Sequence, residues 1–341
     1  MTDGAQVLVT GISGFIGKQC AIALLKQGYR VRGTIRSLKH ADEVRETLSK
    51  HAAIDGRLEF AEADLTSDKG WDAALQGCRY VLHVASPFPM TQPKDLDGLV
   101  GPARDGTLRV LKAAAKAGIA RTVLTSSTVS IMYRAPKPGG APLTEEDWSD
   151  PDHPGIRPYA RSKTLAERAA WDFIKTEKPN MELATVNPGF VLGPALDGDL
   201  STSIEVIKMM LQGKYPAVPR LHFPIIDVRD VADMHVAAMT NPNAAGQRFL
   251  CAESSQWLVK TARAIRAAVP EATKMPTREL PNIIVRLIGL FDPRLGAITP
   301  ELGKLRPIDN AKSVKLLGFK FRTANDAAIA AARSLIDLKL V

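Results

Sequence analysis

Short apolar runs alternate with stretches of helical periodicity along the first 250 residues of the chain. The apolar runs are four to eight residues long and are bounded by turn residues, so they predict buried strands. They cover residues 7–10, 29–35, 58–65, 80–85, 122–127 and 182–187. Apolar residues recur at helical spacing between them, for example over 106–117. Strands that alternate with helices predict an α/β fold with a doubly wound parallel sheet.

Three glycines, Gly11, Gly14 and Gly17, separate the first predicted strand from the helix that follows. Gly11 suits a tight turn, Gly14 lets a diphosphate approach the main chain, and Gly17 lets the helix pack closely on the strand. The helix would direct its unpaired N–H groups at the phosphates. The turn therefore predicts a dinucleotide site formed by Gly11, Ser13, Gly14, Phe15, Ile16 and Gly17.

The end of the second predicted strand carries Arg36, with Arg32 and Lys39 nearby. An acid at this position favours NAD because it accepts a hydrogen bond from the ribose 2′-hydroxyl, whereas a guanidinium accommodates the 2′-phosphate of NADP. Arg36 therefore predicts NADP(H), with Lys39 as a further candidate contact. Arg32 and Lys39 fit solvated charges at a strand end at least equally well.

The third and fourth strands end in further cofactor-binding candidates, which are Asp64, Leu65, Val84, Ala85 and Ser86. Asp64 could reach the adenine amino group, or it could cap a helix that starts near residue 67. The small side chains of Ala85 and Ser86 would let ribose or nicotinamide lie against the strand end. His83 precedes them within an apolar strand, where a histidine more often belongs to the core than to a catalytic site.

Tyr159 and Lys163 lie four residues apart in a predicted helix and so share one face. Reduction of a carbonyl by hydride needs a proton donor at the oxygen, and a phenol with a pKa of about 10 is a poor one at neutral pH. A lysine ammonium one turn away lowers the phenol pKa and can hold the ribose hydroxyls. A serine at the end of a neighbouring strand would hold the oxygen, and Ser127 is preferred over Ser126. The predicted catalytic set is Ser127, Tyr159 and Lys163.

Composition and charge exclude several other classes of protein. The 341 residues are 45% hydrophobic, which suits one large α/β unit with an appended lobe. The three cysteines are far apart and show no C-x-x-C spacing, which argues against disulfides and zinc and favours a cytoplasmic location. Nothing before residue 7 resembles a signal peptide, and the most apolar late run, 283–291, is too short to span a bilayer. The net charge of +9 comes from scattered Lys and Arg, so neither nucleic acid nor a membrane is expected as a partner.

Four motifs occur together in this chain. They are Thr10-Gly11-x-x-Gly14-Phe15-Ile16-Gly17, Thr125-Ser126-Ser127, Tyr159-x-x-x-Lys163 and Asn187-Pro188-Gly189-Phe190-Val191-Leu192-Gly193-Pro194. This combination resembles the extended short-chain dehydrogenases/reductases of the NAD-dependent epimerase/dehydratase family, and within them the dihydroflavonol-reductase-like and cinnamoyl-CoA-reductase-like aldehyde and ketone reductases. The similarity extends from residue 7 to about residue 250.

The resemblance assigns roles to residues of this sequence. It implies catalytic places for Ser127, Tyr159 and Lys163, and the 2′-phosphate place for Arg36. It further implies adenine contacts from Asp64 and Leu65, and nicotinamide contacts from Pro188 and Gly189. Val191 is a further cofactor-binding candidate. Plant flavonoid reductases carry a lysine shortly after the arginine, where this chain offers Lys39 and His40. The substrate-facing stretches 88–92 and 132–140 lack a flavonoid or cinnamoyl signature, so the resemblance does not identify the substrate.

We therefore expect a Rossmann domain over residues 1–190, completed by 225–252, where a strand–helix unit at 227–238 returns the chain to it. A smaller C-terminal substrate lobe is expected over 191–224 and 253–341. The substrate candidates are Phe88, Met132, Tyr215 and Phe223. Ile283, Leu287 and Phe291 are expected to form part of the lobe wall.

The expected reaction is NADPH-dependent reduction of an aldehyde or ketone to an alcohol. One alternative is a nucleotide-sugar epimerase or dehydratase that holds NAD tightly, against which Arg36 argues. Another is a sensor that binds NADP(H) without chemistry, against which the Tyr159 and Lys163 pair argues. A homodimer through helices of the main domain is the expected assembly.

Overall fold

A seven-stranded parallel sheet forms the centre of the larger domain in the computed structural model, which describes residues 4–86 and 95–341. The strands are β1 (Gln6–Thr10), β2 (Arg30–Ile35), β3 (Leu58–Glu62), β4 (Tyr80–His83), β5 (Arg121–Thr125), β6 (Glu182–Pro188) and β10 (Arg248–Cys251). Their order across the sheet is β10-β6-β5-β4-β1-β2-β3. The order reverses between β1 and β4, and ligands of such sheets bind beyond the carboxyl ends of the strands at this point. The predicted doubly wound α/β fold is confirmed.

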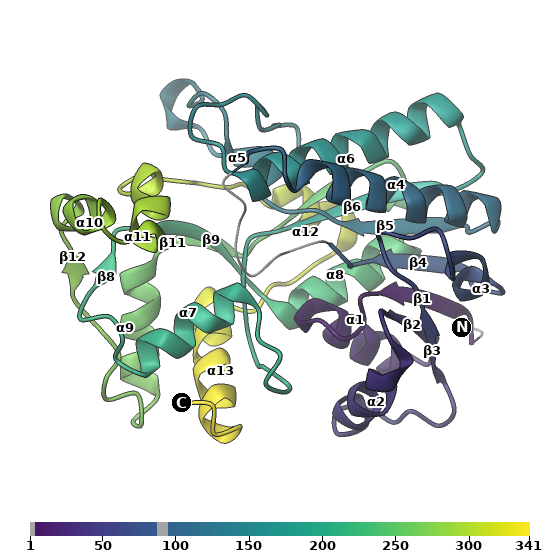
Figure 1. Ribbon diagram of the computed structural model, residues 1–341, viewed down its shortest axis with the longest axis horizontal. Helices are drawn as coiled ribbons and strands as arrows, with labels where there is room; N and C mark the ends of the chain where they lie inside the picture. Colours follow the sequence, from purple (N-terminus) through teal and green to yellow (C-terminus); the bar gives the residue numbers. More distant parts are fainter. Residues whose placement is uncertain (1–3, 87–94) are drawn as a thin grey trace.

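Helices cover both faces of the sheet (Figure 1). On one side lie α4 (Val100–Lys116) and α6 (Pro158–Glu177), and on the other α1 (Phe15–Lys26) and α8 (Val228–Thr240). The smaller helices of this domain are η1 (Leu38–His40), α2 (Ala41–Ser49), α3 (Trp71–Leu75), α5 (Val129–Met132), η2 (Pro138–Gly140), η3 (Pro242–Ala244) and α12 (Ala311–Leu317). Because both faces of the sheet are covered, its strands are apolar along most of their length.

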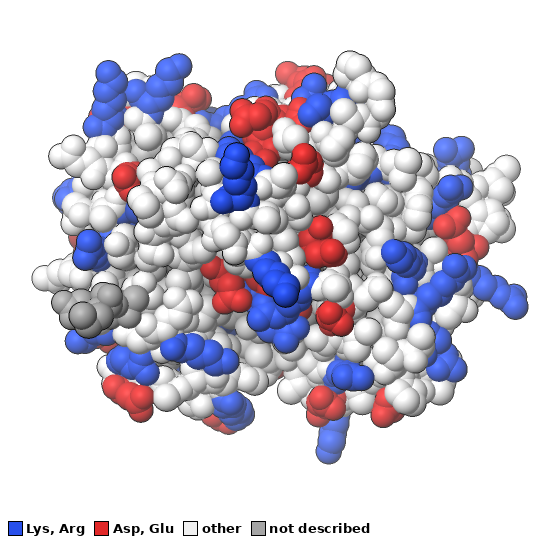
Figure 2. Space-filling model, turned by 180° about the vertical axis from the view of Figure 1, so that it is seen from behind, with Lys and Arg blue, Asp and Glu red and all other residues white. Residues whose placement is uncertain are grey.

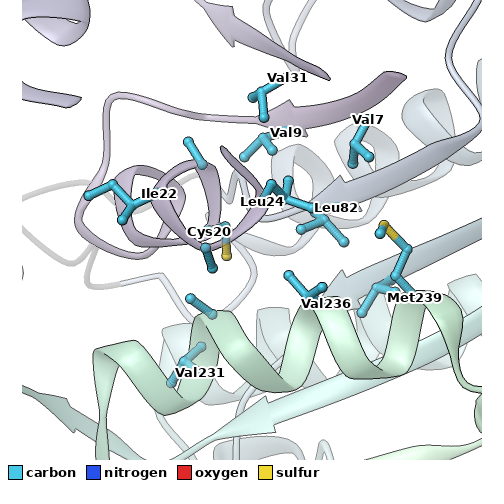
Figure 3. Close-up of a cluster of buried hydrophobic side chains, with 14 of the residues drawn as sticks. Val7, Val9, Cys20, Ile22, Leu24, Val31, Leu82, Val231, Val236 and Met239 are labelled. Atoms are coloured by element: carbon cyan, nitrogen blue, oxygen red, sulfur yellow. The ribbon is translucent and has the colours of Figure 1, made fainter. Parts of the chain in front are cut away.

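The core beneath the sheet lies between the strands, α1 and α8 (Figure 3). Val9 and Leu82 extend from the strands, Cys20 from α1, and Val236 and Met239 from α8, and each is almost completely buried. The alanines of α1 let it pack closely, because a small side chain keeps the helix axis near its neighbours. This packing fixes where the first turn of α1 lies relative to the end of β1.

A smaller lobe lies beside the sheet (Figure 1). It contains a three-stranded sheet in the order β11-β9-β7 and a two-stranded sheet of β12 and β8. Its strands are β7 (Phe190–Leu192), β8 (Val218–Pro219), β9 (His222–Asp227), β11 (Ser254–Trp257) and β12 (Glu279–Leu280). Its helices are α7 (Thr202–Leu211), α9 (Leu258–Ala268), α10 (Asn282–Gly289), α11 (Pro293–Ile298), η4 (Thr299–Glu301) and α13 (Ala324–Asp337).

Three details of the lobe are not predicted from the sequence. The strand of the expected strand–helix unit, β9, pairs within the small sheet, so that only α8 and β10 rejoin the large domain. Leu316, Leu317 and Phe319 pack against the core of the large domain because α12 adjoins β10. Ile283, Leu287 and Phe291 are 67%, 58% and 89% exposed, so they do not belong to the packed core of the lobe. The inner face of α10 is occupied by Val285 instead.

Charged side chains of both signs are intermixed over the face seen in Figure 2. Several oppositely charged pairs contact each other at the surface, such as Lys50 with Glu46 and Lys116 with Asp72, each at 2.8 Å between nitrogen and oxygen. Within residues 4–86 and 95–341, none of the helices has the length and apolar character needed to span a membrane.

Candidate active site

The glycine turn between β1 and α1 has the close approach that its sequence predicts. Gly11 has a φ of +64°, in the left-handed region, and its carbonyl accepts a hydrogen bond from the Gly14 amide at 3.1 Å. A Cβ on Gly17 would lie 2.3 Å from the Gly11 carbonyl oxygen, whereas a Cβ on Gly14 would lie 3.5 Å from it. Gly14 occupies the N-cap of α1, and a glycine brings no side chain that could accept from the first amides. The amides at this helix start suit a diphosphate, which fits the predicted dinucleotide.

The end of β4 packs directly against this turn. The Ala85 amide donates to Thr10 Oγ1 at 3.0 Å, and the Cβ of Ala85 would lie 3.0 Å from a Cβ placed on Gly11. Thr10 Oγ1 also shares a hydrogen bond of 2.8 Å with Nδ1 of His83. Burial, with a smaller effect of Lys163, lowers the pKa of His83 to about 3, so its imidazole is neutral. His83 thus lies in the core and supports the position of Ala85.

Arg32 on β2 and Arg36, which follows the end of β2, have different surroundings. Arg32 donates from Nη2 to Glu59 at 3.0 Å and from Nη1 to the Gln76 carbonyl at 2.7 Å, so it holds the surface of the sheet together. Arg36 is exposed beyond the end of β2, next to the exposed Lys39 on η1. Of the two arginines, Arg36 is therefore the one with a guanidinium available to a 2′-phosphate.

Asp64 follows β3 and binds its own turn. Its Oδ1 accepts hydrogen bonds from the amide and the hydroxyl of Thr66 at 2.7 and 2.6 Å. These bonds, with smaller effects of Arg36 and Arg109, hold the pKa of Asp64 below its ordinary value. The alternative that Asp64 caps a helix near residue 67 is wrong, because α3 begins at Trp71 with Gly70 as its N-cap. Leu65 packs against α4: its Cβ lies 3.0 Å from the position that a Cβ on Gly106 would take.

Ser127, Tyr159 and Lys163 lie together at the carboxyl end of β5. The side chains of Ser127 and Tyr159 are hydrogen-bonded, and Lys163 Nζ donates to the Thr125 carbonyl at 3.1 Å. Ser126 instead donates to the buried Glu167 carboxylate at 2.5 Å. Lys163, Ser126, Ala85 and Ser86 line one small cavity beside α4. The structure therefore brings the predicted catalytic residues to the strand ends that adjoin the glycine turn, with Ser127 rather than Ser126 facing the tyrosine.

The proton affinities of Tyr159 and Lys163 differ from the expectation. Removal from water raises the pKa of Tyr159 to about 12, although the bond to Ser127 lowers it in part. Burial lowers the pKa of Lys163 to about 8, against the opposing effect of Glu167. Lys163 was expected to lower the pKa of Tyr159, but loss of hydration dominates, and the ammonium binds the Thr125 carbonyl. At neutral pH the phenol keeps its proton and the lysine stays mostly charged.

Pro188 ends β6 next to Ser127, and Gly189 follows it directly. The Pro188 carbonyl accepts from the Thr128 amide at 2.9 Å and from Ser127 Oγ at 3.4 Å. A Cβ on Gly189 would lie 2.3 Å from the Pro224 carbonyl of β9, so this residue permits the lobe to approach the sheet. Val191, on β7, is partly buried between the two cores.

The substrate candidates occupy different places. Phe223 stacks on Phe190 with ring centroids 4.7 Å apart, one residue from the Gly189 contact, and therefore adjoins the strand end. Met132 is buried at the end of α5, and its carbonyl accepts from Arg306 at 2.8 Å. Tyr215 lies in a separate surface pocket of the lobe, lined also by Gln212, Lys274 and Arg278, so the structure does not bring it to the Ser127 group. Phe88 lies outside the described residues.

Sequence reasoning missed Glu167 and Arg248. Glu167 lies four residues after Lys163 on α6, is 1% exposed, and pairs with Arg248 Nε of β10 at 2.7 Å. The signal that could have identified Glu167 is its spacing: it lies four residues after Lys163, and therefore on the face of the predicted helix that carries Tyr159 and Lys163.

The profile of the NAD dependent epimerase/dehydratase family matches residues 7–252. The chain belongs to this family. A cinnamoyl-CoA reductase of Medicago truncatula is 36% identical over 251 residues, which cover 72% of this chain and 76% of that protein. A ketoreductase of Aspergillus niger is 32% identical over 350 residues, covering 97% and 98% of the two chains. The resemblance to extended short-chain reductases is thus confirmed.

A solved structure of a related reductase has the same fold over almost the whole chain. Yeast methylglyoxal/isovaleraldehyde reductase Gre2 complexed with NADPH superposes with a TM-score of 0.81 at 28% identity, covering 98% of this chain and 99% of that one. The small lobe is therefore a shared part of the architecture as well as the large sheet.

Proposed function

We propose that this chain reduces an aldehyde or ketone to an alcohol with NADPH, and that Ser127, Tyr159 and Lys163 perform the proton chemistry. The observation that supports this proposal most directly is the hydrogen bond between the side chains of Ser127 and Tyr159, at the end of the sheet that adjoins the glycine turn. The relatives named above are reductases, one of them solved with NADPH, which supports the reaction and the cofactor. Arg36 would take the 2′-phosphate, and the start of α1 the diphosphate.

In the proposed mechanism, NADPH supplies the hydride that forms the new C–H bond at the carbonyl carbon. Ser127 donates a hydrogen bond to the carbonyl oxygen and thereby stabilises the charge that develops there. Tyr159, which is protonated at neutral pH, transfers its proton to that oxygen as negative charge develops there, so the product is the neutral alcohol. Lys163 stabilises the resulting phenolate and holds the ribose hydroxyls, for which its ammonium is placed one helix turn from Tyr159.

The remaining parts of the proposal concern the pocket and the surroundings of the protein. Phe223 would contact the substrate, because its ring stacks on Phe190 directly after the end of β6. Met132 stays a candidate from its place in the sequence, five residues after Ser127. A cytoplasmic location is proposed from the three cysteines, which are free and buried. A homodimer through helices of the large domain is proposed by analogy with the family's usual architecture.

The deciding experiment measures net NADPH oxidation by near-ultraviolet absorbance with aromatic aldehydes, α-diketones, β-keto esters and flavonoid-like ketones. We expect steady oxidation with at least one class, its loss by about 10²-fold or more in Tyr159→Phe, and its retention in the matched control Tyr215→Phe, which lies in the other pocket. Full turnover by Tyr159→Phe would remove Tyr159 as the acid. Absence of NADPH oxidation, together with NAD bound in the purified protein, would favour a nucleotide-sugar epimerase instead.

A further inference from the structure

A buried polar network lies directly behind the proposed catalytic residues. At its centre is the Glu167 carboxylate, which is on the same face of α6 as Tyr159 and Lys163 because the three are spaced four residues apart. Its side chain is completely removed from solvent. Burial of a carboxylate without compensation is strongly unfavourable, so an acid in this place needs hydrogen-bond or charged partners.

Five donors among the described residues satisfy this carboxylate. Oε2 accepts from Ser126 and Ser130, each at 2.5 Å, and from Asn187 Nδ2 at 2.8 Å. Oε1 accepts from Arg248 Nε at 2.7 Å and from Thr185 at 3.2 Å. Although burial alone would raise the pKa of Glu167, Arg248 and the serine bonds outweigh it and hold that pKa below its ordinary value. Glu167 is therefore ionised at neutral pH.

Arg248 connects this carboxylate to the segment 145–148, which precedes α6. Its Nη1 donates to the carbonyls of Glu145 and Asp147 at 2.5 and 2.9 Å, and its guanidinium lies 3.6 Å from the centre of the Trp148 ring. Both charges of the pair are thus held in fixed positions, and Ser126, next to Ser127, is held with them.

We propose that Glu167 is a positioning residue for the reaction: through its hydrogen bonds to Ser126 and Ser130 its carboxylate fixes the strand end that presents Ser127, and it places a negative charge one helix turn from Lys163. This inference rests on the proposed function. It adds a fourth residue to the proposed set of three, and one that touches neither substrate nor cofactor.

The other groups around Lys163 do not replace the carboxylate. On its own helix, Tyr159 is a protonated phenol. On β4, His83 is neutral, with a pKa of about 3. On β5, the Thr125 carbonyl accepts the Nζ hydrogen bond without carrying a charge. On α4, Thr107 lines the same small cavity. The guanidinium of Arg248 on β10 is paired with the carboxylate, with Nε 2.7 Å from Oε1, so among the described residues the negative charge that acts on Lys163 is that of Glu167.

The size of the effect follows from the spacing. Residues four apart on a helix have Cβ atoms about 5–6 Å apart, and an opposite charge at this range shifts a pKa by about one unit or more. Removal of the carboxylate should therefore lower the pKa of Lys163 from about 8 toward neutrality. At pH 8 the fraction of charged lysine would then fall about five-fold.

The test compares wild type, Glu167→Asp, Glu167→Gln and the double variant Glu167→Gln with Arg248→Met. Glu167→Gln leaves a buried unpaired guanidinium and is expected to be unstable, whereas the double variant removes both charges and should regain most of the lost stability. Two pH profiles are recorded for each variant: kcat/KM, and the Kd of NADPH from its fluorescence. The Kd profile reports on Lys163 without requiring turnover.

We expect the alkaline limb of both profiles to lie at lower pH, by about one unit, in Glu167→Gln and in the double variant. Glu167→Asp keeps the charge, so its limb should remain near that of wild type even if its kcat falls. If the double variant recovers its thermal stability and has wild-type pH profiles, Glu167 is only structural. The same conclusion follows if the alkaline limb shifts as far in Glu167→Asp as it does in Glu167→Gln. Failure of the proposed function itself is distinguishable, because it appears as NADPH turnover by Tyr159→Phe.

Discussion

Alanine at Gly14 and alanine at Gly17 should have different consequences, although both glycines belong to the same motif. A Cβ on Gly14 meets its nearest protein atom, the Gly11 carbonyl oxygen, at 3.5 Å, which is an ordinary contact. The backbone of Gly14 has a φ of −78°, which alanine adopts without strain. Gly14→Ala therefore fits the protein alone. Its new methyl group would be in the way only of a ligand that approaches the main chain at this turn.

Gly17→Ala disturbs the protein itself. Its Cβ would lie 2.3 Å from the Gly11 carbonyl oxygen and 2.9 Å from the Cα of Ile12, and real Cβ contacts are essentially never shorter than 3.0 Å. The start of α1 must then move by at least the difference of 0.7 Å. Overpacking of this kind costs about 1–3 kcal/mol, and the helix propensity of alanine returns about 1 kcal/mol of it. We expect a net loss of up to about 2 kcal/mol, or a few degrees in Tm.

The two variants are compared by thermal unfolding without cofactor and by NADPH titration followed by fluorescence. Gly14→Ala should keep the wild-type Tm within about 2 °C. It should raise the Kd of NADPH by about ten-fold or more, because the methyl group would occupy space that the diphosphate needs, and a loss of about 1.4 kcal/mol in binding free energy is ten-fold in Kd. Gly17→Ala should lower the Tm and also raise the Kd. Wild-type NADPH affinity in a stable Gly14→Ala protein would show that the cofactor does not approach the main chain here, and would refute the assignment of this turn.

Three further outcomes test other parts of the site. Arg36→Asp should weaken NADPH binding by more than about ten-fold and NADH binding far less, whereas the control Arg32→Ala should lower the Tm and keep the preference for NADPH. Equal losses of affinity for both cofactors in Arg36→Asp would show that Arg36 does not bind the 2′-phosphate. Ser127→Ala should lower kcat by about 10²–10³-fold, as expected for loss of an oxyanion donor, while Ser126→Ala should mainly lower the stability, because Ser126 binds Glu167. A larger loss of kcat in Ser126→Ala than in Ser127→Ala would exchange the roles of the two serines. Phe223→Ala should raise KM for aromatic carbonyls with NADPH affinity unchanged, which substrate and cofactor titrations separate; an unchanged KM would exclude this ring from the pocket.

The α/β alternation and the place of the glycine turn could be predicted from the sequence because both depend on local rules. Strands buried on two faces are apolar throughout, and Gly11 takes a φ that only glycine adopts easily. Tyr159 and Lys163 could likewise be placed on one helix face, because residues four apart are neighbours on the surface of a helix.

The properties that depend on distant residues could not be predicted in the same way. The pKa of Tyr159 is set by loss of water, which depends on the whole packing around α6, and so the expected lowering by Lys163 did not occur. The partners of Glu167 come from residues 126–248, which no local pattern links. The exposure of Phe291 depends on which face of α10 packs on the lobe, and an apolar residue alone does not specify this.

The junction at Gly189 has a consequence for how such reductases can diversify. A single residue separates β6 of the large sheet from β7 of the small one, and its missing Cβ is what lets the Pro224 carbonyl approach. The first segment of the lobe begins after this residue and ends at Asp227, where α8 starts. Substitutions in its outer parts are compatible with the fold as long as both junctions and the packing of α7 on α13 are kept. Engineering of a new substrate range should leave residues 188–190 and 224–228 unchanged and vary the segment between them.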